Sequence, residues 1–595
     1  MTQLQSRCPS LVQLVTSRRP LRVAGEVTWP VPTLDLPAEA VVDPTGSPVA
    51  ASLQLFEQRA RAARPDFAID ATNAADVREI VRALDGLPLA IELAAAHVDV
   101  LPPAGIRRRL ADRFELLQSD RWDVPARQHT LRAVIDSSAA LLAGEEREHF
   151  ELLGVFAGTF DLEAVEAVTG SAPATAYRLT ASLVRQSLVA PVEGGRFRLL
   201  ESMRVYTLDY LRRTSRLDEV RTRHAAHMLA LMTAGDQGLR GPDQQEWLIR
   251  LRASVPDLRA ALEWLLAGGG PVRGAQLAAI STWFWTREGM LDEAARWMEK
   301  AAEVDIEDRA VRAAVLHASG RIAAPLGDLR RARDACAASI QLSRELEDDA
   351  ALGRALVTLG LCEWALGDLP AAARALDEAA DRAEAGGDRW HRDAALVLRL
   401  RTAVDVGETD VGQRLDLVLS SIRTTGDQHL VGLALGQRAR LGLISGDPDL
   451  AYSTADEALQ HWQSVHYREG EIQARNLRAR ALVVAGQLHR ALADARTAIL
   501  TAADIGHRGG LAEGLETLAT VRYAAGLDEE AQEILTIADR ERERTAIPIP
   551  AADQAALTEL RRSVMERLRN RVAGSGTAGP PRDLERLLAD LRAHG

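Results

Sequence analysis

Lysine is almost absent from this chain of 595 residues. Only Lys300 among its 72 basic residues is a lysine, so the other 71 (72 − 1) are arginines. A phosphate-binding P-loop requires a lysine directly after a glycine-rich turn, in the pattern GxxxxGK. Lys300 follows Glu299 and no such turn, so the sequence contains no Walker A motif. A lysine nucleophile has no support either.

Cysteines and aromatic residues are also scarce. The three cysteines, Cys8, Cys336 and Cys362, are too few and too scattered for a disulfide framework or a thiolate zinc site. Aromatic residues supply 4% of the chain, whereas alanine and leucine recur throughout, which favours helices packed through small side chains. The sequence has no GxSxG, HExxH or CxxC motif, and we expect no enzymatic activity and no metal site.

Two further absences concern membranes and nucleic acids. No run of 18 or more apolar residues occurs, and residues 1–10 lack the apolar core of a signal peptide, so we expect a cytoplasmic protein without a membrane partner. The net charge of −12 provides no overall basic field. Because no LuxR-type helix-turn-helix is visible in the C-terminal region either, we expect no direct nucleic-acid binding.

What the sequence does contain is a repeat of about 40 residues in its C-terminal half. A glycine recurs at intervals of 38, 40, 40, 39, 40 and 40 residues, and a small residue follows each glycine five positions later. Glycine can adopt the positive φ that ends one helix, and the small residue lets the next helix pack closely. The glycines are Gly289, Gly327, Gly367, Gly407, Gly446, Gly486 and Gly526, and the small residues are Ala294, Ala332, Ala372, Gly412, Ala451, Ala491 and Ala531.

This spacing predicts seven antiparallel helix pairs stacked as an α-solenoid, with an irregular helical bundle as the alternative. The pairs resemble tetratricopeptide repeats, although their period exceeds the usual length of about 34 residues and the aromatic pattern is weak. The resemblance implies a concave surface that binds a protein or peptide partner. A scaffold without a ligand groove of its own is the alternative interpretation.

The chain changes character after the last repeat. Pro548 and Pro550 break the helix within residues 546–553, and a further helix is expected to follow. Residues 574–581 (GSGTAGPP) indicate a flexible linker. The last segment carries an apolar stripe that either docks on a partner or caps the solenoid, and we favour capping. The stripe consists of Leu584, Leu587, Leu588 and Leu591.

The N-terminal half combines extended segments with helices. Residues 11–21 and 25–37 predict strands, and a helical region follows them. Further helices then lead to a hairpin predicted at Gly194 and Gly195. Helices that end in a two-stranded hairpin indicate a winged helix.

The order of these segments resembles the C-terminal part of a STAND-type signalling ATPase, of the AP-ATPase or NB-ARC-like class found in large LuxR-type bacterial regulators. The resemblance rests on TSRRPLRVAGEVTWPVP (16–32), LDGLPLAIELAAA (84–96), RFRLLESMRVYTLDYL (196–211) and DLRAALEWLLAGG (257–269). It implies a mainly α protein in which the remnant of a P-loop nucleotide domain, a helical lid and a winged helix precede the solenoid. The regions are a nucleotide-domain remnant with its sensor strand (1–40), a helical lid with the GxP motif (50–120), a winged helix (125–215), a helical bridge (216–310), the tetratricopeptide-like solenoid (311–545), and C-terminal helices with a linker (546–595).

The resemblance also implies two nucleotide contacts, with Arg18 facing the γ-phosphate and Pro88 against the adenine. In the family the P-loop and the Walker B strand lie upstream of the sensor strand, where this sequence has only residues 1–10. Without the P-loop lysine and a carboxylate for Mg²⁺, we expect both contacts to be vestigial and ATP not to be hydrolysed. ATP or ADP would bind only if another polypeptide supplied a P-loop. Alternatively, Arg18 is a solvated or ion-paired charge and Pro88 is the first residue of a helix.

Two weaker clusters remain. His224 and His227 lie three residues apart, a spacing that suits metal ligands, but no third ligand is indicated and packing or surface roles are favoured. Five tryptophans fall close together, as an aromatic ligand box or, in the interpretation we favour, as a core where the bridge meets the first repeat. They are Trp247, Trp264, Trp283, Trp285 and Trp297.

These features predict a regulatory or scaffold protein that binds a protein or signal through its helical repeats and does not hydrolyse ATP. In the alternative, the chain is the C-terminal part of an ATP-dependent transcriptional regulator whose P-loop half is encoded separately or was lost by truncation.

Overall fold

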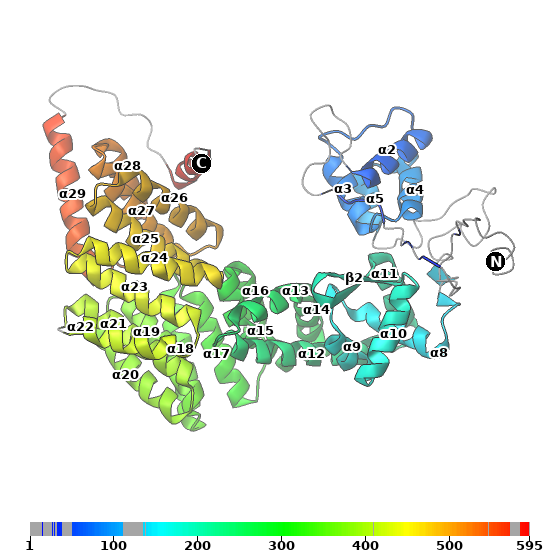
Figure 1. Cartoon of the computed structure of the whole chain (residues 1–595), viewed down its shortest axis with the longest axis horizontal. Coiled ribbons are helices and arrows are strands. Elements are labelled where there is room, and N and C mark those ends of the chain that lie inside the picture. Colours follow the sequence, from blue (N-terminus) through cyan, green and yellow to red (C-terminus); the bar gives the residue numbers. More distant parts are fainter. Residues whose placement is uncertain are drawn as a thin grey trace. The chain divides into compact units, whose positions relative to one another are not determined.

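The structure is a computed structural model in which the chain forms two compact units. Unit 1 comprises Met1–His227 with Ala253–Ala260, and unit 2 comprises Met228–Arg252 with Ala261–Gly595. The structure describes residues 15, 26–27, 29, 33–37, 50–110, 135–136, 139–408, 410–545, 547–571 and 583–593. The predicted strand at 11–21, apart from Val15, and the predicted linker at 574–581 lie outside these residues. Of the strand predicted at 25–37 the structure describes residues 26–27, 29 and 33–37, and none of these is in a strand, so the prediction is wrong for them. The fold is mainly helical, as the composition predicts (Figure 1).

Unit 1 contains two groups of helices and a small sheet. The first group is α2 (Ala51–Ala63), α3 (Ala74–Ala83), α4 (Pro88–Ala96), the 3-10 turn η1 (His97–Asp99) and α5 (Pro103–Arg109). The second is α8 (Gly144–Leu152), η4 (Leu153–Val155), α9 (Leu162–Thr169), α10 (Pro173–Arg185) and α11 (Glu201–Arg213), with strands β1 (Thr159–Phe160), β2 (Val189–Val192) and β3 (Arg196–Leu199) and the turn η5 (Glu193–Gly195). Three helices contribute residues to both units, namely α12 (Leu217–Gly238), α13 (Gln244–Ala253) and α14 (Val255–Trp264).

The sheet of unit 1 is antiparallel with the strand order β1-β3-β2. Val192 pairs with Arg196 at the closed end of the β2–β3 hairpin. Gly194 and Gly195 make the turn with φ of 75° and 71°, values that glycine adopts without strain. The hairpin predicted at this glycine pair is therefore confirmed, and the winged-helix assignment stays a prediction.

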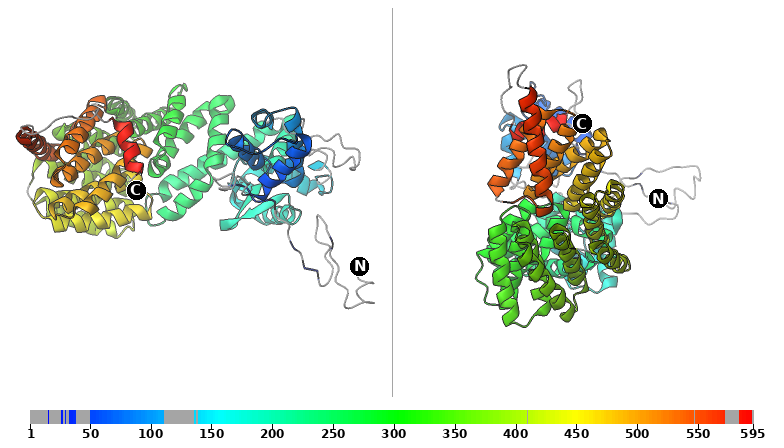
Figure 2. Two further views of the ribbon diagram at one scale, coloured as in Figure 1. Left: turned by 90° about the horizontal axis from the view of Figure 1, so that it is seen from above. Right: turned by 90° about the vertical axis from the view of Figure 1, so that its left-hand side faces the viewer.

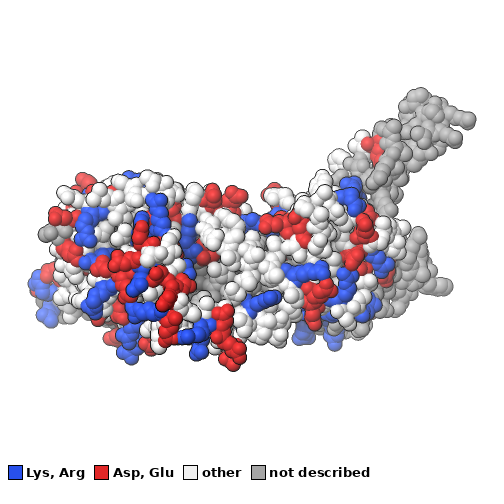
Figure 3. Space-filling view, turned by 90° about the horizontal axis from the view of Figure 1, so that it is seen from below, with Lys and Arg blue, Asp and Glu red and all other residues white. Residues whose placement is uncertain are grey.

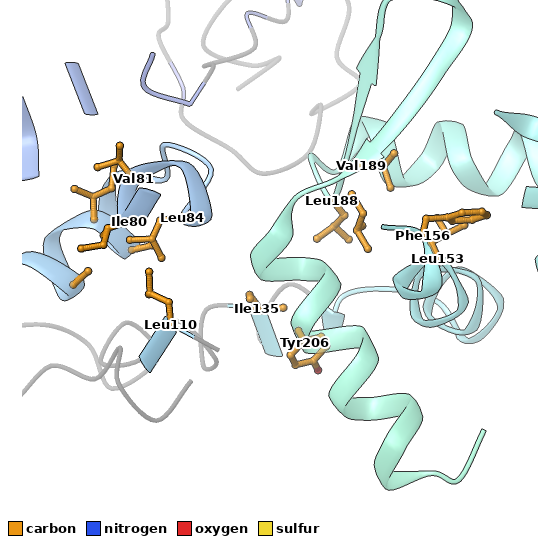
Figure 4. Close-up of a cluster of buried hydrophobic side chains, with 14 of the residues drawn as sticks. Ile80, Val81, Leu84, Leu110, Ile135, Leu153, Phe156, Leu188, Val189 and Tyr206 are labelled. Atoms are coloured by element: carbon orange, nitrogen blue, oxygen red, sulfur yellow. The ribbon is translucent and has the colours of Figure 1, made fainter. Parts of the chain in front are cut away.

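One buried hydrophobic cluster draws on both helix groups of unit 1 (Figure 4). Four of its side chains are at most 2% exposed. They are Ile80 on α3, Leu84 directly after α3, Phe156 directly after η4 and Leu188 just before β2. Burying each such side chain contributes roughly 1.5–3 kcal/mol, so this cluster supplies most of the driving force for folding unit 1.

Unit 2 consists mainly of seven helix pairs stacked in sequence order, which confirms the predicted solenoid (Figures 1 and 2). The pairs are α15 (Pro271–Glu288) and α16 (Leu291–Ala302), α17 (Arg309–Ala323) and α18 (Leu329–Glu345), α19 (Asp349–Ala365) and α20 (Leu369–Ala385), α21 (Arg389–Val406) and α22 (Val411–Arg423), α23 (Gln428–Ile444) and α24 (Pro448–Ser464), α25 (Arg468–Val484) and α26 (Leu488–Asp504), and α27 (Arg508–Ala524) and α28 (Asp528–Thr545). The π-helical turn η6 (Leu265–Gly269) precedes them.

Glycine and aspartate together set the ends of these helices. All seven repeat glycines have a φ between 69° and 88°, as predicted. In several turns the next residue is an aspartate whose carboxylate accepts the backbone N–H three residues later; Asp328 and Asp368 are examples. Each Gly-Asp pair thus ends one helix and caps the next. The six predicted small residues that are alanines are fully buried, and Gly412 is half-buried.

The solenoid folds back so that its early and late pairs touch. The backbone N–H of Arg508 at the start of α27 donates to the carbonyl of Pro325 after α17, at 3.3 Å. The guanidinium of Arg287 on α15 donates to the carbonyl of Val465 after α24, at 3.4 Å. The first helix of each pair therefore faces an enclosed space, and we call these seven the inner helices.

The C-terminal segment packs on the solenoid. Residues 547–550 have no regular secondary structure and lead into α29 (Ala551–Arg571), so the prolines break the helix as predicted. The last helix, α30 (Leu584–Ala593), packs on α26, where Leu587 and Leu591 are buried (Figure 2). The apolar stripe is thus covered by the chain's own repeats, in agreement with the capping interpretation. In the part of the chain that the structure describes, no helix has the length and apolar character to span a bilayer.

The repeat glycines provide a direct test of the solenoid's register. Gly367 has a φ of +85°, and a β-carbon added there would meet only Pro548 Cγ at 3.9 Å, so its requirement for glycine is conformational. Gly367→Val should lower the free energy of unfolding of unit 2 by about 1–3 kcal/mol in urea unfolding followed by circular dichroism. Gly241→Val is the control, because Gly241 has an ordinary φ and open space. Equal stability of the two variants would contradict the assignment.

Candidate functional site

The two predicted nucleotide contacts have different outcomes. Arg18 lies outside the described residues, so its role stays a prediction. Pro88 is the first residue of α4, with an exposed ring. This is the helix-start position that proline favours, and the contact with adenine stays a prediction.

The residues just before Pro88 join three segments of unit 1. Leu34 donates its backbone N–H to the carbonyl of Gly86 at 3.0 Å. Gly86 has a φ of +66°, and a β-carbon there would lie 2.2 Å from the Leu34 oxygen, so glycine is required. The carboxylate of Asp85 accepts the backbone N–H of Glu201 at the start of α11. The LDGLP segment is therefore a junction between the helix groups.

Asp85 makes the stability of unit 1 depend on pH. Burial raises the pKa of Asp85 to about 6, against the partial opposition of the Glu201 N–H and the Arg198 charge. Since the folded-state pKa exceeds the unfolded value of 3.8, the stabilising contribution of this group is complete below pH 4 and is lost as the pH rises through 6. Asp85→Asn keeps an acceptor oxygen and removes a buried charge that costs about 3 kcal/mol.

We expect Asp85→Asn to stabilise unit 1 at pH 7.5 and to have little effect at pH 4, as measured by thermal unfolding at both values. Asp66→Asn, at an exposed position, is the control and should change neither. A stabilisation of equal size at the two pH values would show that charge burial is not the cause.

His224 is a packing residue. Its side chain is 3% exposed, and Nε2 lies 3.0 Å from Oδ1 of Asp257. The same oxygen accepts the backbone N–H of Ala157 at 2.8 Å. Among the described residues, no group of three histidine, cysteine or acidic side chains is placed to hold a metal ion. These contacts agree with the packing interpretation of His224.

A pocket of about 340 Å³ lies in the space that the inner helices enclose. Residues from α15, α17, α19, α21, α23, α25 and α27 line it, and the segment 547–550 forms part of its wall. A hydrogen bond holds that segment in place, since the guanidinium of Arg542 donates to the carbonyl of Pro548 at 3.0 Å. A two-pronged ion pair with Glu516 fixes the guanidinium in turn. The pocket therefore depends on both ends of the repeat array.

Four aromatic rings pack together at one end of the pocket. The ring of Trp283 lies 5.5 Å from that of Trp390, 5.1 Å from that of His429 and 6.4 Å from that of Tyr467. Most of these contacts are edge-to-face or tilted, the arrangement that aromatic quadrupoles favour. We call these four residues the aromatic cluster. Trp283 thus belongs to the pocket wall, whereas its neighbour Trp285 is fully buried in the core.

Three arginines surround Trp283. The guanidinium carbons of Arg240, Arg287 and Arg321 lie 5.9, 5.4 and 4.9 Å from ring centroids of Trp283. Arg240 pairs with Asp236. Arg287 is fully buried, and its Nε and Nη1 have no hydrogen-bond partner among the described residues. Burial lowers the pKa of both Arg287 and Arg321 to about 10, yet both stay charged at neutral pH.

A second arginine–tryptophan stack lies further along the pocket. The guanidinium carbon of Arg401 is 3.2 Å from the centroid of Trp364, whose indole N–H donates to Asp405. Burial, followed by repulsion from Arg440, lowers the pKa of Arg401 to about 10. Its Nε has no hydrogen-bond partner among the described residues.

Three histidines of the pocket wall, His317, His391 and His429, are neutral at physiological pH. Burial lowers the pKa of His391 to about 4 and the pKa values of His317 and His429 well below the usual value. Repulsion from nearby arginines lowers the pKa of all three further. The positive charge in the pocket therefore comes from arginine.

The sequence interpretation missed these arginines, although a signal was present. Arg321, Arg401, Arg440 and Arg480 each stand six residues before a repeat glycine, and Trp283 occupies the same position in the first pair. Every residue at this register lies near the end of an inner helix. Aligning the repeats on their glycines would have revealed the set.

The chain resembles mycobacterial proteins over part of its length. It is 36% identical over 412 residues to a Mycobacterium tuberculosis protein that bears the name "Putative HTH-type transcriptional regulator", a match that covers 66% of this chain and 44% of the relative. It is 40% identical over 244 residues to an uncharacterized protein of the same species, covering 39% of this chain and 59% of the relative. The chain thus spans about half the length of these relatives. No known family profile matches it.

Two solved structures have weaker likeness. A Pyrococcus horikoshii STAND protein with a tetratricopeptide repeat sensor aligns with a TM-score of 0.41 and 14% identity, over 86% of this chain and 74% of that one. A Rap protein complexed with competence and sporulation factor aligns with a TM-score of 0.41 and 12% identity, over 62% and 100%. Both TM-scores are too low to establish a shared fold.

Proposed function

We propose that this chain is the signal-binding part of a bacterial transcription regulator, and that its solenoid takes up a peptide or another small signal molecule in the inner pocket. The observation that carries the proposal is the pocket itself, whose volume of about 340 Å³ falls in the range of ligand sites. Its wall combines apolar side chains with a few buried polar groups that have no partner among the described residues. The similarity to a protein named as a transcriptional regulator supports the regulatory role.

We further propose that the chain binds its signal without chemical turnover and without a resident cofactor. The absence of GxxxxGK from the printed sequence supports this. Acidic and basic side chains are interspersed over the repeats on the face drawn in Figure 3, which favours a protein partner over nucleic acid. Titration with ADP and ATP, together with an assay for phosphate release, tests it. Tight nucleotide binding would instead support the alternative of an ATP-dependent regulator.

The pocket is tested with a pooled library of short peptides, screened against the full chain by thermal shift. Binders should slow hydrogen exchange in α17, α19, α21 and residues 547–550. Ala365→Trp, which fills the pocket from the end of an inner helix, should abolish binding, whereas Ala385→Trp at the exposed end of α20 should not. Binders that protect only outer helices, or that survive Ala365→Trp, would refute the assignment.

A further inference from the structure

Arg321 is a pocket cation that forms no ion pair with the described residues. It lines the pocket, and no described carboxylate lies within ion-pairing distance of its guanidinium. Its neighbour Arg354 pairs with Asp388 at 3.2 Å. A charge removed from water costs several kcal/mol unless an opposite charge meets it. The acidic charge of Asp236 acts on Arg321, but that carboxylate is already paired with Arg240. Without an ion pair of its own, Arg321 therefore marks a place where an anion is stabilised.

The surroundings of Arg321 favour an anion as well. His317, one helical turn before it on α17, also lines the pocket, and Nε2 of its imidazole lies 3.0 Å from the hydroxyl of Thr358. The charges that act on His317 are those of Arg321, Arg354, His391 and Arg240, all of them cations when ionised. The acidic groups near the aromatic cluster have partners, although Oε1 of Glu469 has none among the described residues. Asp236 pairs with Arg240. Asp427 accepts from Trp390 and from the Leu430 backbone, and Glu469 accepts from Tyr467.

Apolar side chains line the same pocket. Val357 and Leu361 of α19, Leu398 of α21 and Leu433 of α23 contribute to the wall. A ligand here must therefore present one anionic group to Arg321 and an aliphatic body to these side chains. A carboxylate matches the planar fork of a guanidinium and its two hydrogen bonds.

We propose that the pocket is a carboxylate site, in which Arg321 holds the carboxylate of a ligand whose aliphatic body packs against Val357, Leu361, Leu398 and Leu433. This inference rests on the proposed function and names the ligand chemistry of the same pocket. The carboxylate belongs either to the C-terminal residue of a peptide or to a free aliphatic acid. Both sources share the chemistry that the pocket recognises.

Calorimetric titration of the full chain with four probes tests the proposal. The probes are N-acetyl-leucine, N-acetyl-leucinamide, 4-methylpentanoate and 4-methylpentanamide, so that each acid has an uncharged partner of the same shape. At least one acid should bind at least about tenfold more tightly than its amide. Tighter binding of N-acetyl-leucine points to a peptide terminus, and tighter binding of 4-methylpentanoate to a free acid. Equal affinity within both pairs, or no saturable binding of either acid, would overturn the carboxylate site.

Two sets of variants locate the site. Arg321→Met should weaken the binding of the acid by about tenfold or more and leave its amide unchanged, whereas Arg312→Met, on the exposed face of the same helix, should change neither. His317→Glu places a carboxylate beside Arg321, so it should unfold at a higher temperature than the uncharged His317→Gln and should no longer bind the acid. A lower unfolding temperature for His317→Glu than for His317→Gln would overturn the proposal even if Arg321→Met failed to fold.

The outcomes separate this inference from the proposed function. Peptides that bind in the pocket with no preference for a carboxylate would leave the proposed function standing and remove the carboxylate site. If no library member binds and none of the four probes binds, both the proposed function and the carboxylate site are refuted.

Discussion

Trp462→Ala is expected to lower the free energy of unfolding of unit 2 by about 3–5 kcal/mol, the usual cost of removing a fully buried aromatic side chain. Trp462, on α24, is fully buried, and glycines of the flanking inner helices form the slot for its ring. A β-carbon on Gly432 would lie 2.6 Å from the indole, and one on Gly470 would lie 2.3 Å from it. The indole N–H donates to the carbonyl of His429 at 3.3 Å. Alanine would leave a cavity and a carbonyl without its partner.

A double-mutant cycle tests the slot directly, by urea unfolding of each variant. Gly470→Val alone should also destabilise unit 2, because its side chain overlaps the indole. With Trp462→Ala in place, the valine has room, so the double variant should be more stable than the sum of the two single effects predicts. Simple additivity would show that the glycines are not what accommodates the ring.

Asp553→Asn is expected to free α29 from the solenoid, at a cost of about 3–5 kcal/mol to the closed state. The carboxylate of Asp553 is 9% exposed and meets Arg440 of α23 at 3.1 Å and Arg480 of α25 at 2.7 Å. Burial alone would raise the pKa of Asp553, but the two arginine charges outweigh burial and lower it. Removing this charge leaves buried arginine charge without its counter-ion, although Arg440 keeps Asp405.

Hydrogen exchange of residues 547–571 measures this effect, with faster exchange expected in the variant. Asp539→Asn is the matched control, because Asp539 also pairs with α29, through Arg561 at 2.6 Å, but at a half-exposed position. An exposed pair contributes only about 0–1 kcal/mol. Equal exchange in the two variants would show that the buried ion group does not hold α29. Faster exchange in Asp553→Asn should extend to the pocket wall, since residues 547–550 precede the helix.

The repeat array was predictable because its signals are local. A positive φ at Gly367 and a capping carboxylate at Asp368 depend on a few neighbouring residues, and the same pair recurs wherever a helix must end. The hairpin at Gly194 and the capping helix with Leu587 and Leu591 are equally local patterns. Such features need no knowledge of which distant segment lies nearby.

The pocket was not predictable in the same way. The favoured interpretation of the five clustered tryptophans as core agrees with the burial of Trp283, Trp285 and Trp297, but it did not predict that Trp283 also lines the pocket. Residues that are two positions apart on a helix point in different directions, so Trp283 reaches the pocket and Trp285 does not. Trp390 and Tyr467, which complete the aromatic cluster, come from other repeats.

The sequence by itself determined the helix pairs, their turns and their order, because hydrogen bonding within a helix and the conformational freedom of glycine act over a few residues. Only the tertiary structure decided that the solenoid folds back far enough for Arg508 to reach Pro325 and for Arg287 to reach Val465. That curvature is the sum of small rotations between neighbouring pairs, set by the packing of every interface at once. It encloses the pocket and leaves Arg321 in it without an ion-pair partner among the described residues, a property of the closed array that none of its repeats has alone.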